Sequence, residues 1–196
     1  MSDVDADRLR DSLSTLTARS LRQPASAVMR PSVRATLERD TAVLTTFRQY
    51  GTDWRLRVDE ATERGGHESG PSPMRYLLTS VAGCLLGWSA KTWAAAHVPL
   101  AEIELEVRTA LDLRGEHRVD DTPAYPPWFV ADLRVHSEAA PDQAIDLARE
   151  ARDRCPVTAL VTRAVPLYLL LHHEGAIVLD ERPDRLSAED REESTT

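Results

Sequence analysis

Apolar residues recur along the chain with two periods, one typical of helices and the other typical of strands. Residues 3–22 predict an amphipathic helix, because leucines return on one face and aspartates stand near its beginning. Three short apolar runs follow, separated by turn residues: 33–38, 42–47 and 54–58. Their close spacing predicts an antiparallel meander of three strands.

The most apolar stretch of the chain predicts a long helix over residues 72–97. Ser72 is suited to the N-cap and Pro73 to the first helical position. The stretch contains no acidic residue and is apolar on most sides, which is typical of a helix that other elements surround. Gly83 and Gly87, four residues apart, form a thin stripe where another backbone can approach.

The second half of the chain mixes strands and helices. Residues 103–111 alternate apolar and charged side chains, which predicts a strand with its glutamates outward. After it we expect a proline-rich loop at 114–127, a strand at 128–136 and an amphipathic helix at 142–154. A short helix beginning at 155–156 and a hairpin of strands 165–172 and 176–179 should follow. A charged tail follows Glu181. This order of elements predicts an α+β fold.

Composition narrows the class of protein. The 196 residues are 42% apolar and 29% charged, which is ordinary for a globular chain with one core. The net charge of −8 disfavours a nucleic-acid or anionic-membrane partner, since both need a basic surface. The apolar stretch 76–96 is interrupted by Lys91 and by hydroxyl residues, so it is interpreted as a core helix and not a membrane span. No apolar leader is visible, and a cytoplasmic location is expected.

Two cysteines are the most informative reactive residues. Cys84 and Cys155 are 71 residues apart, so they form no local metal-binding pair. Cys84 lies within the long apolar helix, where a cysteine usually behaves as a small apolar residue. Cys155 precedes a proline at a helix start, where main-chain amides stabilise a thiolate. Composition and spacing alone leave a structural and a redox interpretation open.

Two segments around these cysteines resemble a known family. Residues 70–84 read GPSPMRYLLTSVAGC and resemble the segment GPSPMELLLASLAGC of the OsmC/Ohr-like family. Residues 154–158 read RCPVT and are similar to the CPVS or CPYS of that family's second cysteine. The resemblance covers about residues 33–179. It therefore predicts an N-terminal helical extension at residues 1–31, an OsmC-like domain at 32–180 and a charged, disordered tail at 181–196.

The resemblance implies an OsmC-like fold in which two antiparallel sheets wrap around central helices in an intertwined homodimer. It implies a peroxidase in which Cys84 attacks an organic hydroperoxide and becomes a sulfenic acid. Cys155 then forms a disulfide with it, and a dithiol reductant, with a lipoyl-type dithiol as one candidate, reduces that disulfide. The family's catalytic arginine is assigned to Arg39, with Arg75 as the other candidate. Neither a cofactor nor a metal is implied.

The sequence departs from the family at the carboxylate that holds this arginine. Met74 stands where the peroxidase branches have glutamate, and Arg75 stands where the PSPM branch has it. Glu68, in the preceding loop, is a candidate substitute. An alternative function is therefore a non-enzymatic binder of hydrophobic or thiol-reactive small molecules. An apolar pocket is expected around Leu78 and Trp88.

A metal site is the alternative to thiol chemistry at the cysteines. Its candidate ligands are the histidines that could join the cysteines: His67 beside Glu68, and the pair His172 and His173. Adjacent histidines on a strand point to opposite faces, so only one of that pair could face a given site. The metal interpretation is disfavoured. His97 and His136 are expected at the surface.

Overall fold

The computed structural model describes residues 4–163, 170–173 and 176–180, and the chain divides into two units, 1–159 and 160–196. The first unit begins with α1 (Ala6–Arg22) and a short 3-10 turn, η1 (Pro24–Ala27). Asp5 caps α1 by accepting a hydrogen bond from the Arg8 amide at 2.9 Å. The amphipathic helix expected at the N-terminus is therefore confirmed, and it starts three residues later than the pattern suggested.

The three-stranded meander is confirmed. β1 (Arg34–Arg39), β2 (Ala42–Gln49) and β3 (Thr52–Val58) pair antiparallel in that order. Residues paired across an antiparallel sheet share one face, and the register places most of the apolar residues on a single face. The members of this apolar face are Ala35, Leu37, Val43, Thr45, Phe47, Trp54, Leu56 and Val58. The other face carries most of the arginines of the sheet.

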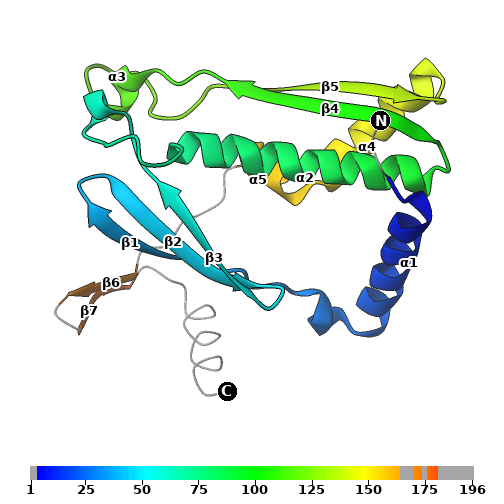
Figure 1. Ribbon diagram of the computed structural model, residues 1–196, viewed down its shortest axis with the longest axis horizontal. Helices are drawn as coiled ribbons and strands as arrows, with labels where there is room; N and C mark the ends of the chain where they lie inside the picture. Colours follow the sequence, from blue (N-terminus) through cyan, green and yellow to red (C-terminus); the bar gives the residue numbers. More distant parts are fainter. Residues whose placement is uncertain (1–3, 164–169, 174–175, 181–196) are drawn as a thin grey trace. The chain divides into compact units, whose positions relative to one another are not determined.

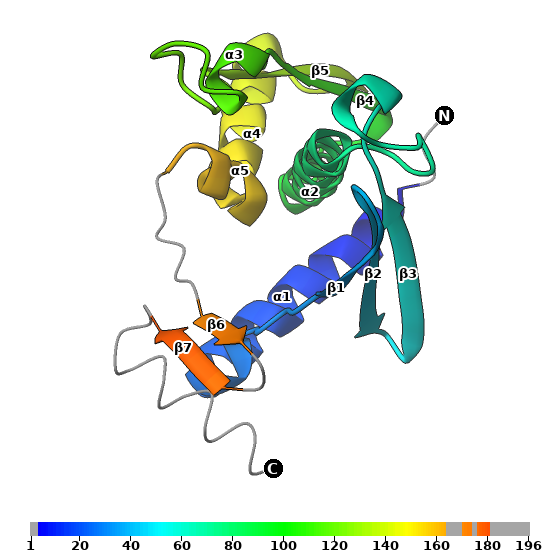
Figure 2. The ribbon, with the colours of Figure 1, turned by 90° about the vertical axis from the view of Figure 1, so that its left-hand side faces the viewer.

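The long helix α2 (Pro73–Ala95) lies between elements that are distant in sequence. A second sheet forms from β4 (Leu100–Thr109) and β5 (Phe129–Ser137), which pair antiparallel. The helices α2 and α4 (Pro141–Arg154) lie side by side on one face of this sheet (Figures 1 and 2). Alternation in β4 turns its glutamates and Arg108 outward, as expected.

One expected loop contains a helix. The segment 114–127 is expected to be a loop because of its prolines, but the structure has the short helix α3 (Leu113–Glu116) at its beginning. Asp112 caps this helix through the Arg114 amide at 3.0 Å. Gly115 lies so close to the carbonyl oxygen of Pro123 that a Cβ there would be 2.3 Å from it. A four-residue helix of this kind depends on these contacts and has no periodic pattern.

The loop before α2 is organised by one buried carboxylate. Asp59 is 1% exposed and receives five hydrogen bonds from main-chain and side-chain donors: Thr41 Oγ1 (2.9 Å), Glu60 N (2.8 Å), His67 N (3.1 Å), Ser69 N (3.0 Å) and Ser69 Oγ (2.8 Å). The short 3-10 turn η2 (Thr62–Arg64) lies within this loop. Asp59 thereby ties the loop to the end of β3 and sets where α2 begins.

The beginning of α2 agrees with the sequence only in part. Ser72 occupies the N-cap position and Pro73 the first turn, as predicted, but the Ser72 side chain makes no capping hydrogen bond. Within the described residues, no helix is long and apolar enough to cross a membrane. His97 and His136 are exposed, as expected.

The core of the first unit lies where α2 meets α4. Leu85, Ala151 and Cys155 form a buried cluster, and Leu105 of β4 packs against it. After α4 the chain forms α5 (Pro156–Val161), which confirms the short helix expected after the Cys-Pro step. In the second unit, β6 (Leu170–His173) and β7 (Ala176–Asp180) pair antiparallel, which confirms the hairpin. The expected strand residues 165–169 lie outside the described residues.

Candidate active site

The fold brings the two cysteines together. Cys84 comes from the middle of α2 and Cys155 from the junction between α4 and α5, and both are free thiols. They share the buried cluster around Leu85 and Ala151, and the Cys84 thiol hydrogen bonds to the Cys155 sulfur. Cys155 is fully buried at 0% exposure, whereas Cys84 is partly exposed. A reagent from solvent therefore reaches Cys84 first.

The surroundings of the two thiols lower the pKa of Cys155 and raise the pKa of Cys84. Burial raises the pKa of Cys155, but hydrogen bonds from Thr158, from Cys84 and from the Val157 amide outweigh it and lower that pKa. The Thr158 amide lies 3.4 Å from the Cys155 sulfur. For Cys84, burial and the hydrogen bond to Cys155 raise the pKa, and the Val157 amide and the Lys91 charge offset them only in part. The first negative charge of the pair therefore lies on Cys155.

An aromatic residue with two cations lies beside the thiols. Trp88, one helical turn after Cys84, packs against the buried cluster. The Lys91 ammonium lies 4.8 Å from the centroid of its indole, and the Arg154 guanidinium lies 4.9 Å from it. Arg154 also pairs with Glu150 at 2.9 Å. The sequence pointed to Trp88 only as a pocket residue and gave no role to either cation.

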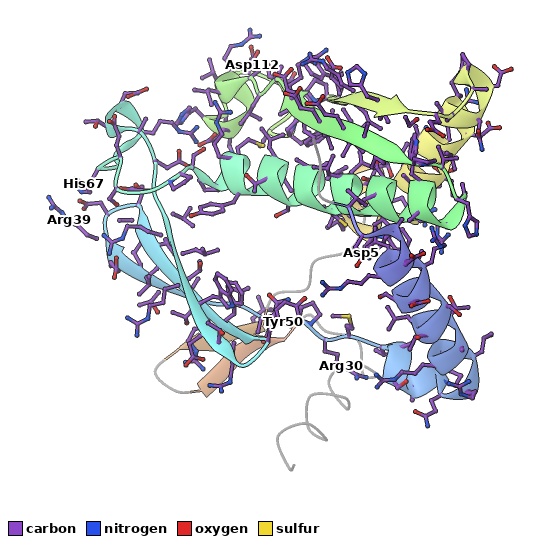
Figure 3. All side chains as sticks on the ribbon, turned by 45° about the vertical axis from the view of Figure 1, so that its right-hand side comes forward. Asp5, Arg30, Arg39, Tyr50, His67 and Asp112 are labelled. Carbon is purple, nitrogen blue, oxygen red and sulfur yellow. The ribbon has the colours of Figure 1, made fainter. Side chains whose placement is uncertain are left out.

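Arg39 lies in a different cluster. It is the last residue of β1, directly before the turn into β2. Its Nε is 3.4 Å from Asp40, and its side chain is 72% exposed. Asp40 in turn lies 2.7 Å from His67 Nε2, and this hydrogen bond lowers the pKa of Asp40. Figure 3 shows Arg39 and His67 next to each other at one end of the meander. Among the described residues, no contact joins Arg39 to either cysteine of the same chain.

The other candidates around the family's missing glutamate are also placed. Glu68 accepts hydrogen bonds from the Thr62 amide (3.3 Å) and hydroxyl (3.1 Å), so its carboxylate is held within its own loop. Arg75 is exposed in the first turn of α2, and Met74 is half-buried. In the described part of the chain, no group of three or more His, Cys, Asp or Glu side chains is placed to hold a metal ion. The side chains of His172 and His173 lie outside the description.

Comparison with known proteins identifies the family. The model of the OsmC-like protein family matches residues 66–169, a segment that includes both cysteines. The chain therefore belongs to the OsmC-like family, and its fold is the α+β fold of that family, with antiparallel sheets and helices. No curated protein matches the sequence.

Solved structures share this fold at low sequence identity. An OsmC-like protein from Mycoplasma pneumoniae is 15% identical with a TM-score of 0.56, over 68% of this chain and 88% of that one. A candidate osmotic stress induced and detoxification response protein from Psychrobacter arcticus is 17% identical with a TM-score of 0.52, over 67% and 88%. An OsmC-like protein of unknown function from Vibrio cholerae is 10% identical with a TM-score of 0.53, over 67% and 93%.

Proposed function

We propose that this protein is a thiol-dependent peroxidase that reduces organic hydroperoxides through Cys84 and Cys155. The observation that carries the proposal is the thiol pair itself. A partly exposed Cys84 hydrogen bonds to a buried Cys155 whose thiolate is stabilised, within a chain of the OsmC-like family. Two thiols in hydrogen-bond contact can form a disulfide with little movement of the backbone.

The proposed reaction has three steps. The Cys84 proton passes along the hydrogen bond to the Cys155 thiolate, and the Cys84 sulfur attacks the hydroperoxide. The O–O bond breaks, Cys84 becomes a sulfenic acid, and the leaving alkoxide takes a proton from water to give the alcohol. The Cys155 thiol then condenses with the sulfenic acid, so that a disulfide forms and water leaves. An external dithiol reduces the disulfide and restores both thiols. The cysteine with the lower pKa thus acts first as the proton acceptor.

We also propose that the working molecule is a homodimer. The apolar face of the meander is uncovered in one chain, with Leu37 65% and Trp54 46% exposed. Gly83 and Gly87 of α2 are exposed too, and apart from their own helix no atom of the described residues lies within 4 Å of a Cβ built at either. Exposed apolar surfaces of this kind are typical of interfaces. We propose in addition that residues 1–31 form an extension outside an OsmC-like domain at residues 32–180. We also expect the protein to be cytoplasmic.

The dimer makes a direct prediction. Light scattering is expected to give twice the 21.8 kDa mass of one chain at micromolar concentration. Leu37→Asp places a charge on the apolar face and is expected to weaken the dimer at least tenfold. Thr36→Asp puts the same charge on the opposite face of the same strand and serves as the matched control. A single-chain mass at all concentrations would refute the dimer.

In the dimer, Arg39 could reach the thiols of the second subunit, since it contacts neither thiol of its own. We therefore expect Met74→Glu to raise peroxidase activity severalfold, because a carboxylate would hold a nearby guanidinium beside the thiolate. Arg39→Ala in the Met74→Glu background should remove the gain, and Arg55→Ala is the matched control on β3. Peroxide consumption with a dithiol is the measurement. Unchanged activity in both Met74→Glu and Arg39→Ala would exclude Arg39 from the site.

Met74 supports a second candidate function. Without the glutamate of the peroxidase branches, the fold could bind hydrophobic or thiol-reactive small molecules without fast turnover. The two functions differ in one assay, because only the peroxidase consumes an organic hydroperoxide repeatedly when a dithiol is supplied. A binder would instead react once, or retain the small molecule unchanged.

A further inference from the structure

Lys91 is distinctive in the composition of the whole chain. Of the 24 lysine and arginine residues, it is the only lysine. Cys84, Trp88 and Lys91 occupy positions i, i+4 and i+7 of α2, which places them on one face of the helix. The one compact ammonium group among the side chains therefore lies in line with the partly exposed thiol.

The contacts of Lys91 differ from those of the other cation in the cluster. Its ammonium lies over the Trp88 indole, 4.8 Å from the centroid, and within the described residues no carboxylate pairs with it. Arg154 lies over the same indole but pairs with Glu150 at 2.9 Å, so its charge is largely balanced. Of the two cations over this indole, Lys91 is the one whose charge acts on Cys84.

Trp88 has the surroundings needed to hold this charge in place. The indole packs against the buried cluster of Leu85, Ala151 and Cys155, which restricts its movement. A cation over a partly desolvated aromatic ring is attracted to the face of that ring. The Lys91 charge already acts on Cys84, where it favours the thiolate against burial. The indole and the ammonium are therefore in contact, and the thiol lies on the same face of α2.

We propose that Trp88 and Lys91 are positioning residues, in which the indole holds the ammonium beside Cys84 so that its charge stabilises the attacking thiolate. Met74 directly follows Pro73 and Arg75 comes next, so the first turn of α2 places no carboxylate at these two positions. The ammonium acts as a fixed charge and keeps its proton throughout. This role adds two residues to the proposed active site. Only the effect of these residues on peroxide turnover rests on the proposed function.

The test measures the alkylation rate of Cys84 with iodoacetamide across pH, in the full-length chain with Cys155→Ala so that a single thiol titrates. Lys91→Met is expected to move the rate profile to higher pH and to slow alkylation at pH 7 roughly fivefold, as the loss of one nearby charge predicts. Lys91→Arg should restore the profile, because it keeps the charge. Arg152→Met removes an exposed charge of α4 that pairs with Asp153, and it should leave the profile unchanged.

Trp88 is tested by the same measurement. Trp88→Leu keeps an apolar side chain but removes the aromatic face, and it should slow alkylation about as much as Lys91→Met does. Trp88→Phe retains a ring and should keep most of the rate, which separates the loss of the ring from damage to the packing. Thermal melting shows which variants are folded.

The outcomes separate this role from the proposed function. Alkylation needs no peroxide, so a shift with Lys91→Met and its rescue by arginine support the charge role even in a chain that fails to reduce hydroperoxides. The role would be overturned if the Cys84 alkylation rate had the same dependence on pH with Lys91 in place as in Lys91→Met. Equal slowing by methionine and arginine would also overturn it, because it would show that the side chain matters for packing and not for charge.

Discussion

Replacing Cys84 by alanine is expected to lower dithiol-dependent reduction of an organic hydroperoxide by about a thousandfold or more, to the background rate. Cys84 is the partly exposed thiol of the pair, and its sulfur makes the bond to oxygen in the proposed reaction. Cys155→Ala is expected to lose turnover as well, for a different reason. It retains the first oxidation and accumulates a sulfenic acid at Cys84, because no second thiol can resolve it.

Two further variants control this experiment. Cys84→Ser preserves the size of the side chain and should be as inactive as Cys84→Ala, which excludes a packing effect. Arg152→Met, at an exposed position of α4, should retain full activity. The opposite pattern, in which Cys84→Ala forms a sulfenic acid at Cys155, would show that the two roles are reversed. The lower pKa of Cys155 makes that pattern the principal rival, and its complete burial opposes it.

Asp59→Ala is expected to cause the largest loss of stability among the substitutions considered, with a melting temperature lower by about 10 °C. The substitution removes the acceptor for five hydrogen bonds and leaves the main-chain amides of Glu60, His67 and Ser69 unpaired within the loop. The beginning of α2, and with it Cys84, should become less well positioned. Asp53→Ala removes an exposed carboxylate that pairs with Arg48 and should change the melting temperature little.

Asp59 also predicts a dependence on pH. Hydrogen bonds, led by that from the Ser69 amide, lower its pKa well below the ordinary value and outweigh the opposing effect of burial. A carboxyl with a lowered pKa stabilises the fold above its unfolded pKa of about 4, and the contribution is lost as the pH falls further. The gap in melting temperature between the original chain and Asp59→Ala should therefore narrow below about pH 4. A constant gap down to pH 2 would contradict this assignment.

Most of the elements could be predicted because their patterns are local. The alternation in β4, the apolar run of α2 and the Pro73 at its first turn each depend on neighbours in sequence. The helix α3 could not be predicted, since its four residues depend on the Asp112 cap and on the approach of Gly115 to the Pro123 carbonyl. The Asp59 network was also missed, because its donors come from both sides of a long loop.

The site could be predicted as far as its two cysteines, since both lie in short segments that resemble the family. The sequence also predicted that main-chain amides would stabilise the Cys155 thiolate, and the Thr158 amide does so. It could not show that Cys84 donates to Cys155 or that Arg154 meets Trp88, because these contacts arise where α2 and α4 pack together. Likewise, Arg39 was expected in its turn, but its link through Asp40 to His67 spans 27 residues of sequence.

The most direct test of the central claim is mass mapping of the two cysteines after treatment with one equivalent of an organic hydroperoxide, without a reductant. The account predicts a peptide pair joined by a Cys84–Cys155 disulfide, with Cys84 as the only residue that forms a sulfenic acid when Cys155 is replaced by alanine. A chain that retains both free thiols, or one in which Cys155 is oxidised before Cys84, would contradict it.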